Sequence, residues 1–146
     1  MSQLGTLKHA YLAYLSQPAT DRVIYRLIDK RPIRSVLELG VGNGVRAERM
    51  IAVASRQQTD TELRYTGIDL FEDRPAGTPR IALKQAYQQL RQQGVKVRLV
   101  PGEPYDALSQ IANYVSGINL VVAAGDQDPE SMARAWMFLP RMIHDD

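Results

Sequence analysis

The stretch VLELGVGNGVRAERM, Val36–Met50, is the most informative part of this chain, because an apolar run enters a cluster of glycines and a helical pattern follows them. Gly40, Gly42 and Gly44 permit positive φ angles and let a ligand approach the backbone closely. The helix that follows begins with unpaired N–H groups, which attract an anionic group. The stretch therefore predicts a strand, a tight ligand-binding turn and a helix.

Three further runs rich in Val, Ile and Leu follow the first one. Together the four runs predict strands over 35–41, 64–70, 95–101 and 118–124. Helical periodicity lies between them and again over 132–139, and Thr78-Pro79 and Asp128-Pro129 each place a capping side chain before a proline, which predicts two helix starts. The alternation predicts a doubly wound α/β fold with helices on both faces of a mostly parallel, Rossmann-like sheet of about four strands in the order 3-2-1-4.

The N-terminal part predicts two helices, over residues 1–31, that belong to the same single domain as the rest of residues 1–146. Leu4, Leu7, Tyr11, Tyr14 and Leu15 recur at helical spacing, and a proline at position 18 ends that segment. A second apolar stripe over 23–28 follows, with a threonine at position 20 as its expected cap.

Composition excludes several classes of protein and site. The chain has 146 residues, which suits one domain, and its formal net charge of +2 gives no block for binding a polyanion. The absence of cysteine excludes a disulfide framework, a thiolate zinc site and a cysteine nucleophile. Charged residues interrupt the first thirty positions, so neither a signal peptide nor a membrane span is predicted. We therefore expect a cytoplasmic protein that does not bind membranes.

The glycine spacing distinguishes between two classes of nucleotide-binding turn. Dinucleotide-binding folds prefer G-x-G-x-x-G, whereas this chain has G-x-G-x-G. The residues from Glu38 to Gly44 resemble the E-x-G-x-G-x-G signature of class I S-adenosylmethionine-dependent methyltransferases. The resemblance implies that Glu38 faces the cationic end of the cofactor and that the turn binds its methionine part through Gly40, Val41, Gly42, Asn43 and Gly44.

The same resemblance assigns residues at the ends of the other strands. Asp69 would accept hydrogen bonds from the two ribose hydroxyls, a role that suits the two acceptor oxygens of a carboxylate. Gly102 and Glu103 take the place of a Gly-Asp pair beside the adenine amino group. Leu70 and Ala124 complete the expected cofactor-binding set.

The fourth predicted strand is similar to a D-x-V-x-I-D-G-D-H segment of small-molecule methyltransferases, with departures. Asn119, Ala124 and Gln127 replace two acidic residues and the histidine of that pattern, so no metal site is predicted. Asp126 remains as the one candidate catalytic residue. The resemblance implies methyl transfer from S-adenosylmethionine to a small-molecule acceptor, for which a dedicated base is optional.

Other functions stay open beside this one. The chain could be a non-catalytic domain that binds S-adenosylmethionine or S-adenosylhomocysteine, or an NAD-binding oxidoreductase domain. Nucleic-acid methylation is disfavoured because no N-P-P-Y-type motif follows the fourth strand. Arg46 and Arg49 are expected on a solvated helix face.

The end of the sheet carries a further expectation. The resembling family continues past the last residues of this chain into more strands, so the fourth strand is predicted to form an open sheet edge. We expect either a truncated domain or a homodimer formed through that edge.

Overall fold

The computed structural model describes residues 6–56 and 62–143 of the chain. Within these ranges the chain alternates between strands and helices, with two short 3-10 helices (η). In chain order the elements are α1 (Thr6–Tyr14), η1 (Ala19–Asp21), α2 (Arg22–Lys30), β1 (Ser35–Leu39), α3 (Val45–Ser55), β2 (Arg64–Asp69), η2 (Phe71–Asp73), α4 (Leu83–Arg91), β3 (Lys96–Pro101), α5 (Pro104–Ile111), β4 (Leu120–Ala123), α6 (Pro129–Ala135) and α7 (Leu139–Met142).

The sheet has four parallel strands in the order β3-β2-β1-β4, which confirms the predicted order and class. The register pairs Leu39 of β1 with Ile68 of β2 and with Ala123 of β4. All strands therefore end at the same edge of the sheet, where the following loops meet.

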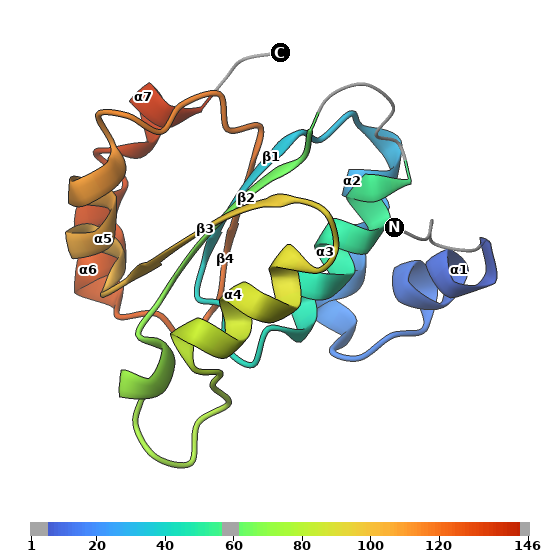
Figure 1. Ribbon diagram of the computed structural model, residues 1–146, viewed down its shortest axis with the longest axis horizontal. Helices are drawn as coiled ribbons and strands as arrows, with labels where there is room; N and C mark the ends of the chain where they lie inside the picture. The colour runs from blue at the N-terminus through green and yellow to red at the C-terminus, as the bar shows by residue number, and fades with distance from the viewer. Residues whose placement is uncertain (1–5, 57–61, 144–146) are drawn as a thin grey trace.

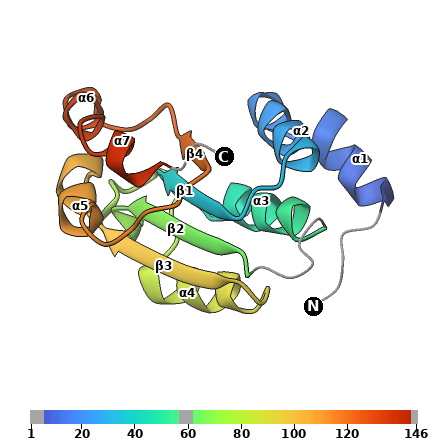
Figure 2. The ribbon, with the colours of Figure 1, turned by 90° about the horizontal axis from the view of Figure 1, so that it is seen from above.

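Helices cover both faces of this sheet. One buried cluster joins the β1 and β2 side chains Val36 and Tyr65 to α2, α3 and α4, and a second joins Leu37 and Ile68 to α5, α6 and α7. Figures 1 and 2 show α5, α6 and α7 together on one side of the sheet and the first four helices on the other. The neighbouring side chains of a strand alternate between the two clusters, as the pleat requires.

The helix boundaries differ from the predictions at three places. Thr20 lies inside η1, and no side chain caps α2. The Thr78-Pro79 pair does not start α4, because the Thr78 hydroxyl donates to the carbonyl of Pro75 and α4 begins only at Leu83. The C-terminal helical pattern is divided between α6 and α7.

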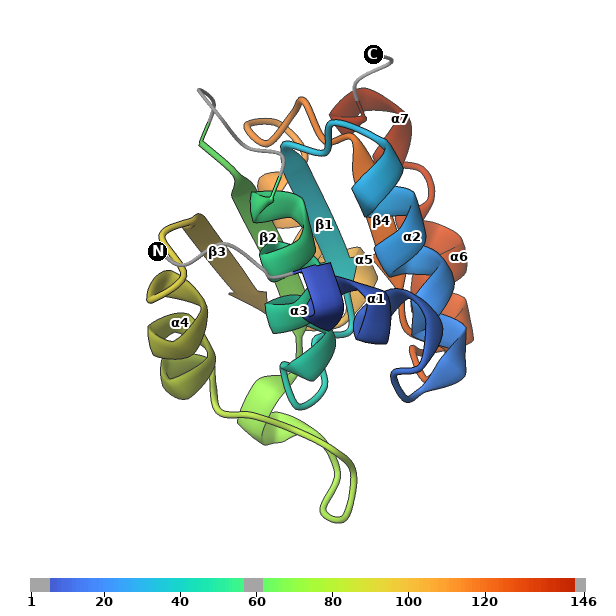
Figure 3. The same cartoon turned by 90° about the vertical axis from the view of Figure 1, so that its right-hand side faces the viewer.

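Asp128 caps α6 as predicted, since its carboxylate accepts a hydrogen bond from the backbone N–H of Ser131. The late start of α4 leaves a long loop after β2. Figure 3 shows this loop projecting beyond the carboxyl end of the sheet. That end is where the glycine turn also lies.

β4 forms an edge of the sheet. Among the described strands it pairs only with β1, beyond which a single bridge joins Ile118 to Ile143. No helix in the described part of the chain combines the length and apolar character needed to cross a membrane.

Candidate functional site

The glycine turn at the end of β1 has the backbone that its sequence predicts. Gly40, Gly42 and Gly44 have φ angles of 99°, 62° and 85°, a region that L side chains rarely adopt. A Cβ added at Gly42 would meet no atom within 4 Å, so this residue borders open space. At Gly40 the space is filled, because a Cβ there would lie 2.5 Å from the side-chain nitrogen of Gln127.

Two cavities lie at this edge of the sheet. The first, of about 320 Å³, is bordered by the glycine turn, by Arg46 of α3 and by the Gln17-Pro18 segment. The second, of about 280 Å³, is bordered by Leu70, Glu103 and the segment 126–128. Arg74 and Asp126 border both cavities, so their side chains lie where a ligand spanning the two would pass.

The carboxylate of Asp69, at the end of β2, accepts all of its hydrogen bonds from other groups of the protein. Its two carboxylate oxygens accept hydrogen bonds from the backbone N–H of Gly42 (2.9 Å), the backbone N–H of Phe71 (2.7 Å), and Nε (2.8 Å) and Nη2 (2.7 Å) of Arg74. A carboxylate offers about four lone-pair sites, so none is left for a ribose hydroxyl. Burial alone would raise the pKa of Asp69, but the hydrogen bonds from Arg74, Gly42 and Phe71 hold it below its usual value.

Arg74 joins two carboxylates of very different exposure. Its side chain is 9% exposed; Nη2 contacts the wholly buried Asp69 side chain, and Nη1 lies 2.8 Å from Asp126, whose side chain is 58% exposed. The hydrogen bond from Arg74 lowers the pKa of Asp126. Sequence reasoning missed Arg74, because no motif marks an arginine five residues after the strand end.

Glu38 does not face the cavity, which corrects the role that the sequence implied. Its side chain is 0% exposed, accepts a hydrogen bond from the Tyr65 hydroxyl and forms an ion pair with Arg46 at 2.6 Å. Glu38 lies on the face of β1 that packs on α2 and α3, and the side chains of Tyr65 and Arg46 cover its carboxylate there. Burial raises the pKa of Glu38, although Arg46 and Tyr65 oppose the shift.

Gly67 makes the contact between Tyr65 and Glu38 possible. Gly67 is paired with Glu38 across the strands, and a Cβ on it would lie 2.9 Å from the Tyr65 ring and from its hydroxyl oxygen. The tyrosine ring therefore passes over the glycine to reach the carboxylate.

Arg46 lies at the cavity rather than on a solvated helix face, so that prediction is wrong. Its side chain is 16% exposed, its Nη2 donates to the Gly40 carbonyl, and its Nη1 lies 3.5 Å from Asp21. Arg49 is also partly buried and donates to the carbonyl of Gln17 at 2.8 Å. Glu38 thus orients a cation that borders the glycine turn.

The other predicted site residues surround the two cavities. Val41, Asn43 and Ala124 border the first cavity with Gly40 and Gly42, whereas Gly44 is buried at the start of α3. The Gly102 N–H donates to the backbone carbonyl of Asp69, and Glu103 borders the second cavity. The structure therefore brings the predicted set to one edge, apart from Glu38. Across residues 6–56 and 62–143, no three His, Cys, Asp or Glu side chains are grouped so that they could hold a metal ion.

A prediction follows from the raised pKa of Glu38. A carboxyl whose pKa is raised in the folded state binds more protons there than in the unfolded state, so stability falls as pH rises from about 4.5 through the folded pKa. Glu38→Gln removes this titration. As pH rises, we expect the free energy of unfolding of the wild type to fall relative to that of the variant. Urea denaturation at several pH values measures both quantities. A constant difference across that range would contradict the buried, desolvated state of Glu38.

Solved structures of other proteins share this arrangement of strands and helices. The O-methyltransferase TomG from Streptomyces achromogenes, solved with S-adenosylmethionine, matches 98% of this chain with a TM-score of 0.62 and 16% identity. A methyltransferase from Geobacter sulfurreducens matches 98% with a TM-score of 0.58 and 18% identity. The cofactor-bound protein Rv0187 from MTB matches 94% with a TM-score of 0.59 and 22% identity.

The chain has the class I S-adenosylmethionine-dependent methyltransferase fold. It spans 62% of the length of TomG, 68% of the Geobacter protein and 58% of Rv0187. No protein-family model matches the chain, and no curated protein sequence matches it. The likeness therefore concerns the methyltransferase fold.

Proposed function

We propose that this methyltransferase-fold chain binds S-adenosylmethionine at the carboxyl end of β1 and β2. The observation that carries the proposal is the open space at Gly42, where a positive-φ turn and the start of α3 border a cavity beside Asp69. The N–H groups of the three glycines donate within the protein, so the backbone donors proposed for the carboxylate of the cofactor's methionine part are those of Val41 and Asn43. Arg46, held by Glu38, adds a cation on the same side.

The glycine turn can accept the cofactor as it stands, whereas Asp69 can bind it only after a rearrangement. The ribose hydroxyls can bond to Asp69 only after Arg74 releases it, because Asp69 accepts no further bond in this arrangement. Asp126 offers Arg74 a second partner that is largely exposed. We therefore propose that the cofactor exchanges places with Arg74, which stays paired with Asp126.

When bound, S-adenosylmethionine supplies an activated methyl group, and we propose a small-molecule acceptor. Asp126 borders both cavities, but its lowered pKa makes it a poor proton acceptor near neutral pH. Its role in this proposal is to hold Arg74 rather than to act as a base. A non-catalytic domain that binds S-adenosylmethionine or S-adenosylhomocysteine is the second candidate, favoured by the occupied state of Asp69.

Calorimetric titration tests the proposal, with S-adenosylmethionine, S-adenosylhomocysteine and NADH as ligands. We expect S-adenosylmethionine and S-adenosylhomocysteine to bind and NADH not to bind. Methyl transfer to members of an acceptor panel separates an enzyme from a binding domain. No heat with either sulfur ligand, or binding of NADH alone, would overturn the proposal.

The variant Gly42→Ala is the sharpest probe of the turn. A left-handed φ of 62° costs an alanine about 1 kcal/mol of stability, and the added Cβ meets no protein atom. It does project into the space proposed for the cofactor. We expect a modest loss of stability and a loss of cofactor affinity of about tenfold or more, which corresponds to about 1.4 kcal/mol.

Gly77→Ala is the matched control for this variant. Gly77 also has a positive φ, of 88°, and a Cβ there also meets nothing within 4 Å, but it lies in the exposed loop after β2. It should lose similar stability and keep the cofactor affinity. Equal affinities in the two variants would place the ligand elsewhere.

We also propose a homodimer through the free edge of β4. The edge leaves backbone groups of 120–123 without a neighbouring strand among the described residues. Sedimentation at increasing concentration tests this, and a folded monomer throughout would reject it.

A further inference from the structure

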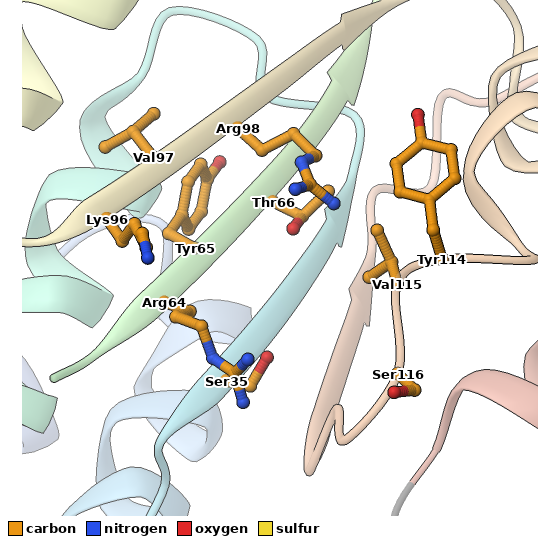
Figure 4. Close-up of a pocket in the computed structure, with 10 residues that line it drawn as sticks. All are labelled: Ser35, Arg64, Tyr65, Thr66, Lys96, Val97, Arg98, Tyr114, Val115 and Ser116. Atoms are coloured by element: carbon orange, nitrogen blue, oxygen red, sulfur yellow. The ribbon is translucent and has the colours of Figure 1, made fainter. Parts of the chain in front are cut away.

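A third cavity lies at the opposite end of the sheet, on the face that α5 covers in part. Its volume is about 260 Å³, and it is bordered by the first residues of three strands, namely Ser35, Arg64 and Lys96. Figure 4 shows these side chains and Arg98 on one wall, facing Tyr114, Val115 and Ser116 on the other. This cavity shares no bordering residue with the two at the glycine turn.

The short length of α5 leaves this part of the sheet uncovered. α5 has 8 residues, and the strand side chains buried in its cluster lie toward the carboxyl ends: Leu37, Leu39, Ile68 and Val100. The positions before them on the same face of β2 and β3 are Thr66 and Arg98. A polar surface therefore continues where the apolar one stops.

The strand register places like charges side by side. Arg64 is paired directly with Lys96, and Thr66 is paired with Arg98 in the next row of the same face. Like charges opposite one another on neighbouring strands destabilise a sheet. A bound anion would remove that repulsion.

These cations have no carboxylate partner in the part of the chain that the structure describes. Within residues 6–56 and 62–143, no ion pair includes Arg64, Lys96 or Arg98, and no Asp or Glu borders the cavity. Arg98 instead lies over the Tyr114 ring at 5.2 Å. Nη2 of Arg64 would lie 3.6 Å from a Cβ on Gly117, so the guanidinium reaches across to the opposing segment.

Protection of a sheet edge explains only part of this pattern. Charged side chains on edge strands prevent unwanted pairing, and β3 is an edge strand. Arg64, however, belongs to the interior strand β2. Edge protection therefore does not explain why Arg64 lies opposite Lys96.

We propose that this cavity binds a small ligand through a phosphate or diphosphate group. Two guanidinium groups and one ammonium group provide charge-assisted hydrogen bonds of the kind that recognise phosphate oxygens. The hydroxyl-bearing residues Ser35, Thr66 and Ser116 border the same space and add neutral donors. The cavity is small and partly open, with strands on one side and the segment 114–116 on the other, which suits a compact anion better than an extended polymer.

Titration of the full chain with inorganic pyrophosphate tests the proposal by NMR. We expect the amide signals of residues 64–66, 96–98 and 114–116 to shift together and the affinity to fall with added salt. Arg64→Ala and Arg98→Ala should each weaken binding by about tenfold or more, and Arg98→Lys should restore part of it. Lys84→Ala removes the same charge from an exposed position of α4 outside the cavity and should change little.

Circular dichroism and thermal melting establish that each variant is folded. Pyrophosphate that shifts no signal, or that binds both arginine variants as tightly as the wild type, would overturn the proposal. So would binding of a single-stranded oligonucleotide without binding of pyrophosphate, because that would assign the surface to a nucleic acid. The S-adenosylmethionine titration is independent, since it reports on the other end of the sheet.

Discussion

Replacing Arg74 by alanine is expected to tighten the binding of S-adenosylmethionine by about tenfold or more. In the wild type, the ribose must displace two hydrogen bonds that the guanidinium donates to Asp69. Hydrogen bonds to a charged group contribute about 1.5–3 kcal/mol, and about 1.4 kcal/mol corresponds to a factor of ten in affinity. The alanine variant leaves both carboxylate oxygens accessible.

Calorimetry on the wild type and Arg74→Ala measures this directly. Arg91→Ala is the control, because it removes one positive charge from an exposed position at the end of α4, outside both cavities at the glycine turn. Its affinity should match that of the wild type. An unchanged or weaker affinity in Arg74→Ala would show that Arg74 does not compete with the cofactor and would favour a role for it in binding.

Replacing Asp69 by alanine is expected to destabilise the fold by about 3 kcal/mol. The change leaves Arg74, whose side chain is 9% exposed, without its buried partner, and it removes the acceptor for the N–H groups of Gly42 and Phe71. Phe71 has a positive φ of 54°, so its backbone conformation depends on that hydrogen bond. Cofactor binding should be lost as well.

Asp126→Ala is the matched control, since it removes the other carboxylate of the same arginine. Because Asp126 is largely exposed, we expect a loss of at most about 1 kcal/mol. Urea denaturation gives both values. Similar losses in the two variants would contradict the unequal roles of the two carboxylates.

The lowered pKa of Asp69 adds a pH dependence to this prediction. Its stabilisation is present above the unfolded pKa of about 3.9 and is lost as pH falls through the lower folded value. The difference in free energy of unfolding between the wild type and Asp69→Ala should therefore become smaller in strong acid. A difference that grows in strong acid would show that the pKa of Asp69 is raised in the folded state instead of lowered.

The parallel class of the sheet could be predicted because it depends on local patterns that repeat, whereas the order 3-2-1-4 is the one expected of a Rossmann-like fold. Apolar runs separated by helical segments allow few connections, since crossovers between parallel strands are right-handed. The positive φ angles at Gly40, Gly42 and Gly44 and the cap at Asp128 also follow from single residues and their neighbours. Interactions of this short range are visible in a sequence.

Arg74 and the start of α4 could not be predicted, because both depend on how one loop folds against distant residues. Ile81 is buried with Val41 and Phe71, which draws the end of this loop into the core. Thr78 bonds within the loop instead of capping a helix. The resemblance assigned Glu38 to the cofactor, whereas the Tyr65 hydroxyl and the Arg46 guanidinium, which no motif links to it, occupy its carboxylate.

The passage of the Tyr65 ring over Gly67 has a consequence for how this chain can change over evolutionary time. Any side chain at position 67 would displace the phenol from a carboxylate that has no access to water. A mutation there becomes tolerable once the tyrosine has been replaced by a smaller residue and Val41, whose Cγ2 would lie 2.9 Å from the same Cβ, has also changed. Positions 41, 65 and 67 should therefore vary together among descendants of this sequence.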